Sequence, residues 1–95
     1  MRPDERVKQI RALLAQNQKG LAVSLGRAMG YERFCRVVTT RVQTTPALLK
    51  CDPGSILVSA FRIAQLQLSP DPALGQAWII PRKGRAEFQL GYLVL

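Results

Sequence analysis

The sequence predicts an α+β domain in which amino-terminal helices precede an antiparallel β-hairpin. Two features of the pattern lead to this class. Apolar residues recur at helical spacing up to about residue 68, and after Gly75 they alternate among β-branched and aromatic neighbours. A length of 95 residues, 47% of them hydrophobic and 21% charged, fits one globular domain. We therefore expect a single domain over residues 1–95, helical over 1–68 and a hairpin over 76–95.

Two helices are expected in the first 30 residues. Pro3 and the two acidic residues behind it suit the positive end of a helix dipole, which predicts a helix over about 4–17 that Gly20 ends. Apolar residues four apart predict a second, short helix over about 21–29, with Gly30 as its end.

The third and fourth helices follow from stronger signals. An amphipathic segment from Tyr31 to about Thr44 predicts the third helix, which ends before a proline and has a basic wet side. Asp52 is suited to cap the fourth helix and Pro53 to begin it, and apolar spacing continues this helix to about Leu68. The fourth helix is the most apolar of the set.

A proline-containing break over residues 69–72 separates the helices from the strands. We expect strands over Ala77–Ile80 and Ala86–Val94, joined by the turn Arg82–Arg85, whose glycine suits a hairpin. Residues 90–95 are apolar on both faces of the second strand. An isolated hairpin cannot bury them, so a partner, further chain or aggregation is expected to cover them.

The charge indicates a polyanionic partner. The chain has 14 Lys and Arg against 6 Asp and Glu, a formal net charge of +8, and residues 1–50 hold most of the excess. Nucleic acid, an anionic membrane surface and an acidic protein are the partners that such a charge favours. The membrane surface is the least favoured of the three, because the basic residues are not concentrated opposite one wide apolar stripe.

Composition excludes several classes of site. The chain has no His, and Cys35 and Cys51 lack Cys-x-x-Cys spacing. The residues that His-based catalysis and the common zinc sites require are therefore missing. No glycine-rich phosphate-binding motif is present, and the carboxylates are too scattered to predict a two-metal nuclease. We therefore expect a protein that is not an enzyme and that holds no metal or cofactor.

Compartment is inferred from two further features. The uncharged run Ala12–Gln18 is too short for a signal peptide or a membrane span, so we expect a cytoplasmic protein. In a reducing compartment the two cysteines are expected to be small buried residues, with a disulfide or a reactive thiol as the alternative.

Two basic constellations are candidates for nucleic-acid binding. The first joins the turn cations to nearby aromatic residues, because cations neutralise phosphates and aromatic rings stack on unpaired bases. Its members are Arg82, Lys83, Arg85, Trp78, Phe88 and Tyr92. The second is a stripe on the third helix, made of Arg33, Arg36 and Arg41. The alternative for the first is a solvent-exposed turn whose neighbouring aromatic residues belong to the core. The alternative for the second is the ordinary solvent-facing side of an amphipathic helix.

Four motifs occur in a characteristic order along the second half of the chain. They are Pro46–Pro53 with Ser55 behind it, Ala64–Pro70, Gly75–Pro81 and Gln89–Tyr92. The preceding helix also fits, with Glu32-Arg33 near its start and Thr39-Thr40 further along. In this order the motifs resemble the RecT family of phage and prophage single-strand annealing proteins, and the resemblance covers most of the chain.

The resemblance implies an ATP-independent protein that binds single-stranded DNA, anneals complementary strands in phage-type recombination and assembles into rings or filaments. It implies the cytoplasm of a bacterial host as the location and a phage exonuclease as a further partner. It also adds Gln89, in the last motif, to the DNA-binding candidates.

Two departures from the family pattern bear on these expectations. This chain has Gln67 where many members carry a Gly, and it ends at Leu95 where members usually continue with a long second half. We therefore expect an incomplete annealing core with impaired annealing. The alternative is a non-catalytic prophage remnant, or an oligomeric interaction module that pairs its last strand with a partner and binds no DNA.

Overall fold

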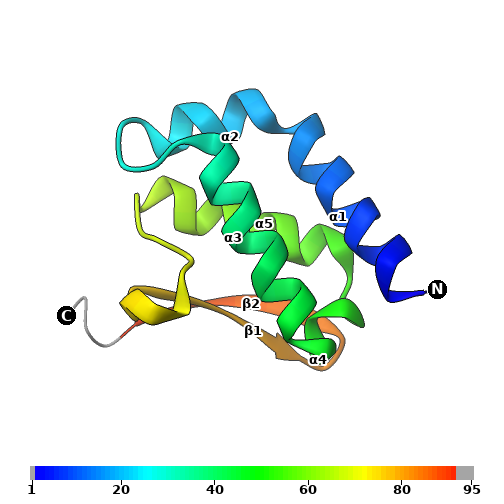
Figure 1. Cartoon of the computed structure of the whole chain (residues 1–95). Coiled ribbons are helices and arrows are strands. Elements are labelled where there is room, and N and C mark those ends of the chain that lie inside the picture. Colours follow the sequence, from blue (N-terminus) through cyan, green and yellow to red (C-terminus); the bar gives the residue numbers. More distant parts are fainter. Residues whose placement is uncertain (1, 92–95) are drawn as a thin grey trace.

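Five α-helices precede a two-stranded antiparallel hairpin in the computed structural model, which describes residues 2–91 (Figure 1). This order confirms the predicted α+β class. The elements are α1 (Pro3–Gln16), α2 (Gln18–Leu25), α3 (Tyr31–Thr44), α4 (Pro46–Leu49), α5 (Pro53–Gln65), the short 3-10 turn η1 (Pro72–Leu74), β1 (Ala77–Arg82) and β2 (Arg85–Leu90).

Helix α5 lies between the first two helices and the hairpin (Figure 1). It contacts α1 and α2 on one side and both strands on the other. Ile56 and Ile63 of α5 are fully buried, as is Phe34 of α3, and they belong to one cluster of apolar side chains. Each large side chain buried in this way stabilises the fold by about 1.5–3 kcal/mol. The predicted apolar character of α5 therefore reflects burial on two sides.

Helix α3 is amphipathic, as its sequence predicts. Phe34, Val38 and Val42 are fully buried, whereas Arg33 and Arg36 on other faces are exposed. The helix ends at Thr44, two residues before Pro46, which confirms the predicted stop.

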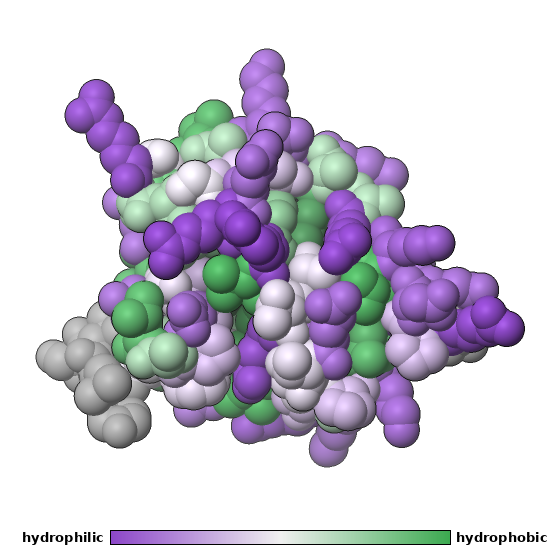
Figure 2. Space-filling model, viewed as in Figure 1, coloured by the Kyte–Doolittle hydropathy of each residue, from purple (hydrophilic) through white to green (hydrophobic). Residues whose placement is uncertain are grey.

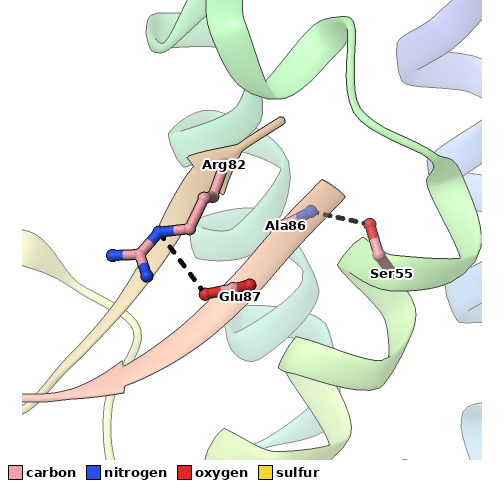
Figure 3. Close-up of polar contacts among 4 residues, drawn as sticks. All are labelled: Ser55, Arg82, Ala86 and Glu87. Carbon is pink, nitrogen blue, oxygen red and sulfur yellow. Dashed lines mark hydrogen bonds and ion pairs between the residues drawn. The ribbon is translucent and has the colours of Figure 1, made fainter. Parts of the chain in front are cut away.

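The start of α5 holds the hairpin turn in place. Asp52 caps α5 by accepting a hydrogen bond from the Ser55 backbone N–H at 3.1 Å, and Pro53 occupies the first turn, as predicted. The Ser55 hydroxyl donates to the Asp52 carbonyl at 2.6 Å. The same hydroxyl accepts from the Ala86 N–H at 2.8 Å, as Figure 3 shows. The Asp52 N–H in turn donates to the Gly84 carbonyl at 2.8 Å. Two opposed hydrogen bonds thus attach the tip of the hairpin to this helix end.

The hairpin turn contains two residues, because Arg82 pairs with Arg85 across the strands. Lys83 and Gly84 both adopt positive φ, 51° and 79°, which is the backbone of a tight turn that matches the strand twist. β1 therefore extends two residues beyond the predicted Ala77–Ile80. The predicted hairpin and its glycine-containing turn are confirmed, with a shorter turn.

The first two helices begin and end at residues other than those predicted. α1 ends at Gln16, and α2 begins at Gln18, so Gly20 lies inside α2 rather than ending the first helix. The Asn17 side chain donates to the Leu13 carbonyl at 2.8 Å, which satisfies an orphan carbonyl at the junction. Gly26, with φ 57°, ends α2 four residues before the predicted Gly30.

Three further features differ from the prediction: one additional helix and the ends of α5 and β2. The short helix α4 was not predicted, and it begins at Pro46. α5 ends at Gln65 instead of about Leu68, because Gln67 adopts a left-handed φ of 55°. β2 ends at Leu90, whose side chain is 40% exposed. The predicted continuation of this strand to Val94, and the covering of the apolar end, fall on 92–95, outside the described residues.

No helix within residues 2–91 is long and apolar enough to cross a membrane. Cys35 and Cys51 are free thiols, so the alternative of a disulfide is wrong. Cys51 is buried, as expected, whereas Cys35 is only partly buried.

Candidate nucleic-acid interface

One face of the hairpin carries most of the predicted strand and turn residues. Side chains alternate between the faces of a strand, and Ala77, Ile79 and Ala86 are buried towards the helices. The outer face therefore carries three cross-strand pairs. They are Trp78 with Gln89, Ile80 with Glu87, and Arg82 with Arg85.

Phe88 is separated from this group. It pairs with Ile79, belongs to the inner face and packs against the buried cluster. The structure thus favours the core alternative for Phe88, and the outer face for Trp78 and Gln89. Tyr92 lies outside the described residues.

The tip of the hairpin presents three cations to solvent, since Arg82, Lys83 and Arg85 are all exposed. Arg82 Nε lies 3.6 Å from Glu87 Oε2, in a pair whose side chains are 64% and 53% exposed (Figure 3). Such an exposed ion pair contributes little to stability and is easily exchanged for a phosphate. Because Ser55 and Asp52 bind backbone groups of the turn, the backbone that carries these cations is held against the start of α5.

Helix α3 and the hairpin meet at a contact that sequence reasoning missed. The Arg41 guanidinium carbon lies 5.5 Å from the centroid of the Trp78 ring, within the range of a cation–π interaction. Both side chains are partly buried. The predicted helix stripe and the predicted hairpin surface are therefore joined into one surface through these two residues. A sequence pattern cannot show a contact between residues 37 positions apart.

Two hollows run along α3 and share part of their lining. The α3–loop hollow lies between α3 and the loop before β1, and its lining includes Arg36, Thr40, Arg41 and Asp71. The α1–α3 groove lies between those two helices, and Arg36 and Thr40 line it as well. Figure 2 shows hydrophilic side chains projecting over much of the face that carries α1 and α3, with apolar areas between them.

The arginine stripe predicted on α3 is thus divided by the structure. Arg36 lines both hollows and Arg41 lines the α3–loop hollow, whereas exposed Arg33 lines neither of them. Sequence reasoning missed Arg11 of α1, which lines the α1–α3 groove opposite α3. The excess of cations in the first half of the chain was the available signal for it.

Two acidic groups in the α1–α3 groove remain uncharged near neutral pH. Burial raises the pKa of Tyr31 to about 12, and a hydrogen bond to Cys35 adds to this effect. Burial also raises the pKa of the Cys35 thiol, which the hydrogen bond with Tyr31 partly offsets. Neither group therefore brings a negative charge to the groove.

The RecT family model matches residues 32–95, which is most of the chain. The chain belongs to the RecT family. It is 41% identical over 61 residues to Protein RecT of Escherichia coli strain K12, a match that covers 64% of this chain and 23% of that protein. It is 42% identical over 60 residues to the uncharacterized protein YqaK of Bacillus subtilis strain 168, covering 63% and 21% of the two chains. No solved structure matches.

The matched RecT segment and the candidate surface overlap in large part. The segment contains nearly all of α3, and α4, α5 and the hairpin, and thus the cations of the α3 stripe and the hairpin tip. α1 and α2 precede it, so the Arg11 side of the α1–α3 groove lies outside the RecT match. The chain spans less than a quarter of the length of either relative.

Proposed function

We propose that this RecT-family chain binds single-stranded DNA without sequence preference and contributes to ATP-independent strand annealing in phage-type recombination. The observation that supports this most is the joined surface of the hairpin and α3. It brings Arg82, Lys83 and Arg85 at the tip, and Arg41 on Trp78, together within the segment that matches the family.

The cations supply affinity through the phosphates. Lys and Arg side chains that neutralise phosphates release condensed counterions, and this gain depends on salt but not on base sequence. The turn residues suit this role because they are exposed and held by the start of α5. An ATP-independent annealing protein needs this type of contact, since both strands must bind whatever their sequence.

Trp78 and Gln89 provide a means to hold bases. An aromatic ring stacks on any unpaired base, and an amide side chain offers a donor and an acceptor beside it. The two residues face each other across the strands on the outer face. Arg33, Arg36 and Arg41 extend the positive field along α3, with Tyr92 as a further contact predicted from the sequence alone.

The chain spans less than a quarter of the length of either relative, and its described residues supply the cationic surface. We propose that the chain supplies a strand-binding part and that copies of it associate into homo-oligomers on DNA. In this proposal the chain acts in the cytoplasm of a bacterial host as a non-enzymatic protein, with a phage exonuclease as a further partner.

Sedimentation velocity with and without an unstructured oligonucleotide tests this proposal. We expect the sedimentation coefficient to rise with DNA and to return towards that of the free protein for Arg82→Ala/Lys83→Ala/Arg85→Ala. A control with the same loss of charge is Arg2→Ala/Lys19→Ala/Arg27→Ala, three exposed cations outside the joined surface, which is expected to retain binding. If both triple variants lost DNA binding equally, net charge alone would explain the loss, and the proposed surface would not be supported.

One observation favours an interaction module as the second candidate. The sheet has two strands, so each strand has an edge that no strand in the described part of the chain covers, and Leu90 is 40% exposed beside one of them. A partner strand could pair there. Oligomers that form equally well with and without oligonucleotide would support this candidate over DNA binding.

A further inference from the structure

The α1–α3 groove places two arginines from different helices around one hollow. Arg11 projects from α1 and Arg36 from α3, and the lining between them includes Thr40 and Gln43. Both arginines are exposed, and neither lies within 4.0 Å of a carboxylate among residues 2–91. Guanidinium groups that no carboxylate neutralises keep their full charge and donors for a bound anion.

The groove has no acidic side chain that is charged at neutral pH. Among the described residues its lining contains no Asp or Glu, and its Tyr31 and Cys35 are protonated at neutral pH even at their ordinary pKa values, which burial raises further. The adjoining hollow towards the start of α1 adds Lys8 and Asp4, whose charges offset each other. Two positive charges therefore dominate the groove.

The polar groups in the groove suit a phosphate oxygen. Arginine presents parallel N–H donors to two oxygens of a phosphate, and hydroxyl and amide groups add single hydrogen bonds. Arg36 and Thr40 also line the α3–loop hollow, together with Arg41, whose guanidinium group lies over the Trp78 ring. The groove thus adjoins the surface proposed to hold DNA, which favours a nucleic-acid backbone over an unrelated small anion.

We propose that Arg11 and Arg36 bind backbone phosphates of single-stranded DNA in the α1–α3 groove, as a second contact apart from the hairpin tip. This inference rests on the proposed function, since it assumes that the chain binds DNA. It also goes beyond the RecT match, because Arg11 belongs to α1, which precedes the matched segment. The strand would run from the hairpin tip past Trp78 and over α3 into the groove.

Cys35 provides a test in the unaltered protein, because it lines the groove and is partly buried, whereas Cys51 is 1% exposed. Alkylation is measured at mildly alkaline pH, since the thiolate is the reactive form. We expect a saturating oligonucleotide to slow alkylation of Cys35 at least about threefold and to leave Cys51 unreactive throughout. An unchanged Cys35 rate with DNA fully bound would overturn the inference and leave the proposed function intact.

The second measurement is the salt dependence of affinity in Arg11→Gln/Arg36→Gln. Each phosphate contact on single-stranded nucleic acid contributes roughly 0.7 to the slope of log affinity against log salt, so losing two contacts makes the slope shallower by about 1.4. The matched control is Lys19→Gln/Arg27→Gln, which removes two exposed cations that line none of the hollows. We expect the control to keep the slope of the unaltered protein.

Three further outcomes would count against the inference. Equal changes of slope in the two double variants would overturn the inference, because net charge alone would then explain them. Protection of Cys35 by polyglutamate but not by the oligonucleotide would assign the groove to an acidic protein and overturn it as well. If the unaltered protein binds no DNA, the proposed function and the inference both fail.

Discussion

The Ser55 hydroxyl accepts a hydrogen bond of 2.8 Å from the Ala86 backbone N–H, across 31 positions of the chain. The same hydroxyl donates to the Asp52 carbonyl, so one side chain joins the capped start of α5 to the first residues of β2. This side chain is therefore one of two hydrogen-bonded links between the start of α5 and the hairpin tip, the other being the bond from the Asp52 N–H to the Gly84 carbonyl.

Replacing Ser55 by Ala is expected to destabilise the protein by about 1–3 kcal/mol, because the buried Ala86 N–H loses its partner. Ser59→Ala is the matched control. Ser59 is equally buried, but its hydroxyl donates only to the Ser55 carbonyl within α5, so its loss should cost about 1 kcal/mol or less. Urea denaturation of both variants measures the difference. Equal losses would show that the link to Ala86 contributes nothing.

Gln67 is expected to limit the stability of the chain. Its φ of 55° is a left-handed conformation that suits glycine, at the position that follows the end of α5. Gln67→Gly should raise the free energy of unfolding by about 0.5–1 kcal/mol, after the greater freedom of glycine in the unfolded chain is counted. The contrasting variant is Gln65→Gly, at the last residue of α5, where the weak helix propensity of glycine should lower stability by up to about 1 kcal/mol. A thermal melt that ranks the two in the opposite order would be inconsistent with this conformation.

Gly91 approaches the backbone of the loop before β1 too closely for a side chain. Its N–H donates to the Gln76 carbonyl at 2.9 Å, and a Cβ added there would overlap the Gly75 carbonyl oxygen. Gly91→Ala should therefore cost about 1–3 kcal/mol. Gly30→Ala is the control, because a Cβ there meets no atom within 4 Å, and its cost should stay within about 0.5 kcal/mol. The comparison fails if Gly91→Ala is as stable as Gly30→Ala.

Tyr31 is expected to keep its proton to unusually high pH. In Tyr92→Phe it is the one tyrosine left, and phenolate absorbance should show a midpoint near its folded-state pKa of about 12, against about 10 in the unfolded chain. Since the folded state then holds the proton more tightly, this group favours folding below pH 10 and loses that contribution as pH rises towards 12. In Tyr31→Phe/Tyr92→Phe, the free energy of unfolding should lack this loss between pH 10 and 12. A midpoint near 10 would contradict the burial of the hydroxyl.

Local signals in the sequence were sufficient for the class and for the best-defined helices. Asp52 followed by Pro53 marks a helix start by chemistry that acts within three residues, and the structure has that cap. The Tyr31–Thr44 helix is confirmed at both ends, because amphipathic spacing and a following proline act in the same direction.

The features that were mispredicted or missed depend on competing local preferences or on contacts between residues far apart in the sequence. Gly20 has weak helix propensity, but it lies within α2, near Phe61 of α5, where packing outweighs propensity. The Arg41–Trp78 contact and the α1–α3 groove depend on how helices and strands are placed in space. No residue spacing could have predicted Arg11 and Arg36 on one hollow, whereas the core alternative stated for Phe88 agrees with its place on the inner face.

The salt dependence of binding to an unstructured oligonucleotide tests the central claim most directly. If the joined surface of the hairpin and α3 holds the strand through about four to six phosphates, log affinity should fall against log salt with a slope of roughly −3 to −4. Fluorescence anisotropy over a series of salt concentrations gives this slope. A flat dependence, or no binding at low salt, would contradict the account.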